Sequence, residues 1–234
     1  MSASASFQTR SAPGSAGSPA SSLPYLERHQ GDLEEYIHNV GRSAAGRYGP
    51  AFWGLWDQRV APADDAVIID LGAGTGALLR QLRARLPQAR LSGVELHPAL
   101  AAPLRALGEE LGFGVVEADL GHPLPLPAAS ADVVTSLLSF HELPYPPALL
   151  DRAVELLRPG GVLLLHDIVK WPLAEYLQAR PLNPDTLQHY REHCLFTADD
   201  LRFLVERAGL QVLDLTHHEG GRFATLVARA PVPA

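Results

Sequence analysis

The stretch that decides the fold is "VIIDLGAGTGALL", residues 67–79. It begins with a short apolar run, typical of a strand buried in a sheet, and that run ends at Asp70. Gly72, Gly74 and Gly76 follow at alternate positions. Glycines there permit positive φ and close approach of a ligand to the backbone, and the helix expected next presents unpaired N–H groups. The stretch therefore predicts a strand, a tight turn and a helix that together bind a nucleotide.

Strands and helices alternate along the rest of the chain. Short Val/Ile/Leu runs separated by longer helical stretches indicate βαβ units and a buried parallel sheet. "RPGG" is expected to stop a helix and form a turn, and "HHEGG" to join two strands as an antiparallel hairpin. The pattern predicts an α/β fold with a seven-stranded, Rossmann-like, doubly wound sheet, mostly parallel with an antiparallel C-terminal strand. The expected strands are 67–71, 90–95, 113–117, 131–137, 161–167, 210–216 and 222–229.

Size and composition bound the class of protein. A chain of 234 residues that is 47% hydrophobic can bury one substantial core, so one domain is expected. The formal net charge of −7 argues against a nucleic-acid partner, because such proteins usually carry a basic excess. Cys194 is the only cysteine, so no intrachain disulfide forms, and a reduced cytoplasm is the expected location. No apolar run approaches the roughly 18 residues of a membrane helix, and a homodimer is left open.

Two further acids stand where strands are expected to end. Glu95 ends the second strand, 19 residues beyond Gly76, and a carboxylate there can accept hydrogen bonds from both hydroxyls of a ribose. Asp119 follows the third strand in "EADL", where it can accept a hydrogen bond from an adenine amino group.

The glycines of residues 72–76 do not decide between a dinucleotide and another nucleoside ligand, because with Ala77 they also satisfy the G-x-G-x-x-A form of the dinucleotide fingerprint.

Taken together, residues 66–230 resemble the class I S-adenosylmethionine (SAM)-dependent methyltransferases over about seven tenths of the chain. "DLGAGTG" resembles their first motif, Glu95 their ribose acid, "EADL" their adenine motif, and "LLRPGGVLLLHD" the approach to their fifth strand. The closing hairpin resembles their reversed seventh strand, inserted between the fifth and sixth. The resemblance implies SAM as cofactor, bound by Asp70, Gly72, Ala73, Gly74, Gly76, Glu95, Leu96, Asp119, Leu120 and Leu137. An NAD(P)-linked oxidoreductase and a noncatalytic SAM-binding protein are the alternatives.

The resemblance implies methyl transfer to a small organic acceptor, with an oxygen or nitrogen acceptor preferred. "SLLS" after the fourth strand departs from the motif of enzymes that methylate exocyclic amines. His141 stands where the family often lines the junction of cofactor and substrate, so it is a candidate general base or a packing residue. His166 and Asp167, at the end of the fifth strand, form a second candidate catalytic pair. Glu142, His166 and Asp167 offer metal-binding atoms, but no acidic pair stands where the family's metal acids would, so no metal is predicted.

Residues 1–22 are rich in Ser, Ala, Gly and Pro and are expected to form a disordered tail. The two segments expected to choose the acceptor are 23–60 and 171–196. Residues 23–60 show helical spacing and many aromatics, and by the resemblance form an N-terminal helical lid before the SAM-binding domain at 61–234. A substrate-side insertion is expected at 171–196. The predicted substrate contacts are Tyr25, Tyr36, Trp53 and Trp171.

Overall fold

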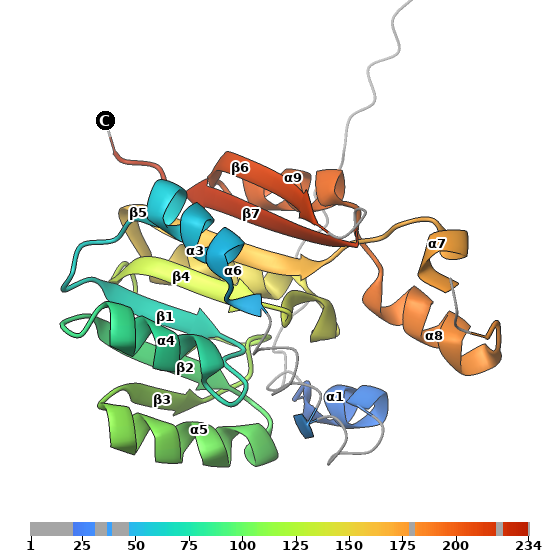
Figure 1. Ribbon diagram of the computed structural model, residues 1–234, viewed down its shortest axis with the longest axis horizontal. Coiled ribbons are helices and arrows are strands. Elements are labelled where there is room, and N and C mark those ends of the chain that lie inside the picture. The colour runs from blue at the N-terminus through green and yellow to red at the C-terminus, as the bar shows by residue number, and fades with distance from the viewer. Residues whose placement is uncertain (1–20, 31–36, 39–46, 178–180, 219–221, 234) are drawn as a thin grey trace, which may run out of the picture.

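A seven-stranded sheet forms the centre of the computed structural model, which describes residues 21–30, 37–38, 47–177, 181–218 and 222–233. Its strand order is β3-β2-β1-β4-β5-β7-β6 (Figure 1). β7 is antiparallel to both β5 and β6, and the other pairings are parallel. The predicted doubly wound sheet with a reversed last strand is confirmed. The strands are β1 Val67–Leu71, β2 Arg90–Glu95, β3 Gly114–Glu117, β4 Ala131–Leu137, β5 Leu157–Ile168, β6 Gln211–His218 and β7 Phe223–Arg229.

Helices cover both faces of this sheet, because neighbouring strand residues point to opposite sides. Ile69 belongs to a core cluster with leucines of α6 (Pro147–Leu156) and α9 (Ala198–Arg207). Ile68 belongs to a second cluster with leucines of α4 (Ala77–Arg85) and α5 (Pro98–Leu111). The second cluster also takes Trp56 and Val60 from the π-helix η1 (Trp56–Val60), which follows α3 (Pro50–Leu55). These two cores hold the carboxyl ends of the strands in place.

β5 begins earlier than the sequence predicts. "RPGG" was expected as a turn, but it lies inside β5, where Leu157 pairs with Ala131 and the register then shifts. Gly160 has φ +78, and a Cβ on Gly161 would lie 2.9 Å from the Ala131 carbonyl oxygen. The two glycines therefore stand where the pairing of β4 with β5 is irregular, a position that glycine in a strand pattern often marks.

The segments outside the sheet lie at the carboxyl ends of the strands. α1 (Leu23–Gln30) lies near the ends of β1 and β2, and α7 (Leu173–Leu177) and α8 (Pro184–His193) stand beyond β4 and β5 (Figure 1). The predicted tail reached residue 22, but Ser22 is buried, so its end was placed too late; residues 1–20 lie outside the described ranges. Of the helices described, none is long and apolar enough to cross a membrane.

Replacing Thr197 by Ala should lower the free energy of unfolding by about 1 kcal/mol. Thr197 is the N-cap of α9 and forms a capping box, in which its Oγ1 accepts from the Asp200 N–H and the Asp200 carboxylate accepts from the Thr197 N–H. Urea unfolding of the two proteins measures the difference. Thr197→Ser keeps the hydroxyl and should remain near wild type; equal losses in both variants would contradict a capping role.

Candidate active site

The loop between β1 and α4 is shaped by glycines with positive φ. Gly72, Gly74 and Gly76 have φ of +73, +55 and +83. The N–H groups of Gly72 and Ala73 both donate to the Val94 carbonyl oxygen at 2.9 Å, which ties the loop to β2. A Cβ on Gly72 would collide with the side chain of Ser139. The loop therefore needs glycine both for its backbone conformation and for its close packing against the segment after β4.

Asp70 is a buried carboxylate at the end of β1. Its Oδ1 accepts a hydrogen bond of 2.7 Å from the Thr135 hydroxyl. Burial raises the pKa of Asp70 to about 7, although the Thr135 hydrogen bond and the nearby Arg47 both favour the ionised form. A buried carboxylate that titrates near neutrality is a group that a bound cation would stabilise in its charged form.

Glu95 joins two loops. Its Oε2 accepts a hydrogen bond of 2.9 Å from the Gly74 N–H, and its Oε1 accepts one of 2.9 Å from the His97 N–H. Burial raises its pKa, against the effect of these backbone hydrogen bonds. Each carboxylate oxygen retains a second lone pair, so these contacts leave room for the predicted ribose hydrogen bonds.

Asp119 contacts the N-terminal segment. Its carboxylate accepts hydrogen bonds from the Ser22 N–H at 2.6 Å, the Ser22 hydroxyl at 2.9 Å and the Gly121 N–H at 2.8 Å. The sequence predicted an adenine partner for this carboxylate, and Ser22 is a partner that it did not predict. An adenine that binds here would share the carboxylate with Ser22 or displace it.

These groups line one cavity of about 310 Å³, a size within the lower range of small-molecule sites. Of the predicted cofactor residues only Gly76 is not on its wall; a Cβ there would meet Leu104 and Leu107, so Gly76 serves helix packing. The sequence missed several lining residues, among them Arg47, Tyr48, Ser139 and Glu142. Those predicted and found on the wall are Asp70, Gly72, Ala73, Gly74, Glu95, Leu96, Asp119, Leu120, Leu137 and His141.

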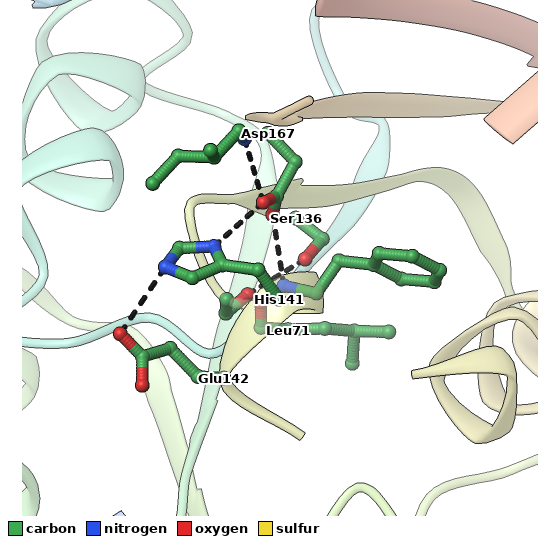
Figure 2. Close-up of polar contacts among 8 residues, drawn as sticks. Leu71, Ser136, His141, Glu142 and Asp167 are labelled. Carbon is green, nitrogen blue, oxygen red and sulfur yellow. Dashed lines mark hydrogen bonds and ion pairs between the residues drawn. The ribbon is translucent and has the colours of Figure 1, made fainter. Parts of the chain in front are cut away.

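His141 lies between two carboxylates at one end of this cavity (Figure 2). Its Nδ1 is 2.6 Å from Oδ1 of Asp167, and its Nε2 is 3.2 Å from Oε1 of Glu142. Burial opposes a charged ring, but the two carboxylates outweigh burial and raise the pKa of His141 to about 10. Burial also opposes a charged Glu142, but His141 lowers the pKa of Glu142 to about 2. At neutral pH the ring is therefore an imidazolium paired on both sides.

Asp167 fixes the orientation of this histidine. It is fully buried, and besides His141 its carboxylate accepts hydrogen bonds from the Phe140 N–H at 2.9 Å and the Ile168 N–H at 2.7 Å. The 3-10 helix η2 (Phe140–Glu142) is thus held against the end of β5, and Nδ1 of His141 keeps its proton toward Asp167. Only Nε2 is left for chemistry in the cavity.

The predicted catalytic pair of His166 and Asp167 is not formed. Nδ1 of His166 is 2.7 Å from Oγ1 of Thr225, and its ring stacks on Phe223 with centroids 5.6 Å apart. Burial lowers the pKa of His166 to about 4. His166 does not line the cavity, because adjacent strand residues point to opposite faces of the sheet. The pairing is therefore corrected: Asp167 supports His141.

Of the aromatic residues predicted to contact the substrate, the three in the described part of the chain do not line this cavity. The Trp53 ring packs under the Arg85 guanidinium at 4.3 Å and its Nε1 donates to Gln81, on the α4 side of the sheet. Trp171 packs edge-on against Tyr176, at 5.4 Å between centroids. Tyr25 lies in α1 and does not line the cavity, and Tyr36 is outside the described residues. From the N-terminal segment, Tyr48 lines the cavity, and burial raises its pKa to about 12.

Comparison with known proteins agrees with this geometry. Residues 46–215 match a family model described as a methyltransferase domain. The ubiquinone biosynthesis O-methyltransferase of Xanthomonas axonopodis pv. citri is 33% identical over 172 residues, which cover 68% of this chain and 67% of that protein. Other curated relatives are matched over only 35 to 40% of their own length.

Solved structures share the fold at low identity. A SAM-dependent methyltransferase from Aquifex aeolicus has a TM-score of 0.58 at 16% identity, covering 80% of this chain and 97% of that one. The cyclase SpnF has a TM-score of 0.63 at 18% identity, covering 78% and 82%. With the family match, the glycine loop and the acids at the strand ends, the chain belongs to the class I SAM-dependent methyltransferase family.

Proposed function

We propose that this protein transfers a methyl group from SAM to an oxygen or nitrogen atom of a small organic acceptor. The observation that carries the proposal is the single cavity that joins the glycine loop and its acids to the polar end formed by His141 and Glu142. O-methyltransferases among the relatives support an oxygen acceptor. The cyclase among the fold neighbours is a reason to test the reaction directly, because a shared fold does not determine function.

The cavity residues fit SAM by their chemistry. The cofactor carries a positively charged amino group and a sulfonium, and the buried Asp70 carboxylate is a matching anion on the wall. Glu95 would accept from the ribose hydroxyls and Asp119 from the adenine amino group. When bound, SAM supplies an already activated methyl group, so the protein mainly aligns the acceptor and removes its proton.

The acceptor end is expected to lie at His141 and Glu142. In the free protein Nε2 of His141 carries a proton and is paired with Glu142. Glu142 must therefore move away and this proton must pass to solvent before Nε2 can take a proton from an acceptor hydroxyl. Asp167 would then stabilise the imidazolium that forms, because its carboxylate is already hydrogen-bonded to Nδ1. The general-base role of His141 stays a prediction, as do the cytoplasmic location, the absence of a nucleic-acid partner and a homodimer.

Replacing Asp70 by Asn should weaken SAM binding roughly 10- to 100-fold, the equivalent of a hydrogen bond to a charged group. With its pKa near 7, Asp70 is largely protonated below that pH, so binding of a cation must release a proton. Wild-type affinity should therefore fall about tenfold for each pH unit below 7, whereas the variant should lack this dependence. Calorimetric titration from pH 5.5 to 7.5 measures both.

Asparagine is the matched replacement at this position, because its amide oxygen can still accept from the Thr135 hydroxyl. The variant should also be no less stable than wild type above pH 7. Because folding raises the pKa of Asp70 from 3.8 to about 7, the wild-type protein loses stability as the pH rises between these two values. Equal affinity of the two proteins for SAM at every pH would show that Asp70 does not face the cofactor.

Binding and turnover together test the proposed function. Calorimetric titration with SAM, its demethylated product and NAD should show binding of the first two only. Binding of NAD alone would contradict the proposal that SAM is the cofactor of this protein. Incubation with methyl-labelled SAM and a set of small phenols, carboxylic acids and amines should transfer label to at least one acceptor. SAM binding with no transfer to any acceptor would favour a noncatalytic SAM-binding protein.

A further inference from the structure

At one end of the cavity, two residues of its wall lie close to a histidine that is not on the wall. His141 and Glu142, from η2, meet His193, from the end of α8. One ligand atom from each residue lies within 4.8 Å of the other two. We propose that His141, Glu142 and His193 form a binding site for a divalent transition-metal ion of the zinc class.

The distances suit such an ion. Tetrahedral ligands at the usual zinc–nitrogen bond length are about 3.4 Å apart, and Nε2 of His141 is already 3.2 Å from Oε1 of Glu142. The rings of His141 and His193 are 5.4 Å apart between centroids, in an edge-to-face arrangement. The three ligand atoms lie within 4.8 Å of one another. His193 therefore needs to move by about 1.4 Å at most to reach the tetrahedral spacing, a change within the reach of a side-chain rotation at the end of a helix.

The ligand set is one that zinc uses. Two imidazoles and one carboxylate occur at zinc sites that keep a fourth position open. His141 and Glu142 line the cavity, so that open position would face it. An oxygen-only cluster, which a magnesium or calcium ion prefers, is not what these residues offer.

The surroundings supply the second set of contacts that metal-binding histidines usually have. Asp167 accepts from Nδ1 of His141 at 2.6 Å, which fixes the ring and directs Nε2 toward Glu142 and His193. Behind His193, the His189 ring lies 4.5 Å away between centroids, and Nδ1 of His189 is 2.7 Å from the Tyr176 hydroxyl. α7 and α8 are thus arranged around the cluster.

Charge also favours an ion here. The carboxylates of Glu142 and Asp167 flank the imidazole of His141, so two negative charges lie beside the proposed site. A divalent ion would take the place of the proton on Nε2, which passes to solvent, and would balance both carboxylates.

The sequence offered a different metal set. From the sequence, Glu142, His166 and Asp167 were the residues with metal-binding atoms, and no metal was predicted. The structure does not test that prediction. His166 points to the other face of the sheet and Asp167 is engaged with η2, whereas His193 follows His141 by 52 residues and reaches it only through the packing of α8 on η2. The ion would therefore link the 171–196 insertion to the cavity.

The experiment uses the untagged 234-residue chain, treated with a chelator and titrated with Co²⁺, whose visible absorption reports a tetrahedral site. We expect one saturable site per chain that Zn²⁺ displaces. His193→Gln and Glu142→Gln each remove a proposed ligand and should weaken Co²⁺ binding at least 100-fold. Asp167→Asn changes the residue that hydrogen-bonds to a ligand and should weaken binding roughly 10- to 100-fold. His217→Gln, which removes an exposed histidine of β6, is the matched control and should bind as wild type.

Circular dichroism and SAM affinity establish that each variant is folded. Wild-type protein that shows no saturable Co²⁺ absorption, or a His193→Gln variant that binds Co²⁺ as tightly as wild type, would leave the cluster as an ion pair without a metal and overturn the proposal. The site itself does not depend on methyl transfer, but a role in holding an acceptor oxygen rests on the proposed function. Because Co²⁺ and SAM binding are measured separately, failure of one is distinguishable from failure of the other.

Discussion

Replacing His141 by Ala is expected to lower kcat at saturating acceptor by about 100-fold or more, the lower end of what a general acid or base contributes. SAM affinity should change little, because Nε2 points to the Glu142 end of the cavity and not to the glycine loop. The measurement is the initial rate of methyl transfer to the acceptor found by screening, together with the Kd for SAM. Turnover that is unchanged at saturating acceptor would remove His141 from the mechanism.

A matched control for this variant is His166→Asn. His166 precedes Asp167 in β5 and is also partly enclosed, but it contacts Thr225 and does not line the cavity. Asparagine can keep the contact with the Thr225 hydroxyl, so the variant should turn over within a few-fold of wild type. A loss as large as that of the His141 variant would mean that the sequence-based pairing of His166 with Asp167 deserves to be restored.

The loss in the His141 variant does not by itself separate a base from a metal ligand, since both use Nε2. Chelator-treated wild-type protein makes the distinction. Full turnover without metal would show that Nε2 of His141 removes the acceptor proton after Glu142 moves away. Loss of turnover that Zn²⁺ restores assigns this nitrogen to the ion, whose Lewis acidity would then lower the pKa of an acceptor hydroxyl.

The place of the three strand-end acids on the cavity wall was predictable from the sequence, because it follows from one geometric rule. The carboxyl ends of parallel strands meet at one edge of a doubly wound sheet, so acids at three strand ends meet there too. Asp70, Glu95 and Asp119 all line the cavity as that rule requires. The contacts that complete them, such as Ser22 with Asp119, depend on how the N-terminal segment packs and leave no periodic signal.

The acceptor end was predicted less well, for two different physical reasons. His166 and Asp167 were expected on one rim, although strand alternation places neighbouring residues on opposite faces of the sheet. His193 had no comparable signal in the sequence, because its position depends on the tertiary packing of α8. Trp53 shows the same limit, since an aromatic side chain that packs on Arg85 and one that contacts a ligand have the same sequence pattern.

Replacing Gly72 by Ala is expected to weaken SAM binding at least 100-fold and to lower the free energy of unfolding. Two costs add at this position. The left-handed backbone, φ +73, costs a residue with a Cβ about 1–2 kcal/mol. The new Cβ would also collide with Ser139, which has little freedom to move because its Oγ donates to the Leu71 carbonyl oxygen at 2.9 Å and lies 2.7 Å from Oγ of Ser136.

Gly112→Ala separates the two costs. Gly112, the C-cap of α5, has φ +71, but a Cβ there meets nothing within 4 Å, so this variant incurs the backbone cost alone and should bind SAM as wild type. Adding Ser139→Gly to the Gly72 variant should recover part of its stability, and the double-mutant cycle measures the collision. If the Gly72 and Gly112 variants lose equal stability and both bind SAM normally, the contact of the loop with Ser139 does not hold the cofactor site, and its shape must come from Glu95 and the Gly74 N–H instead.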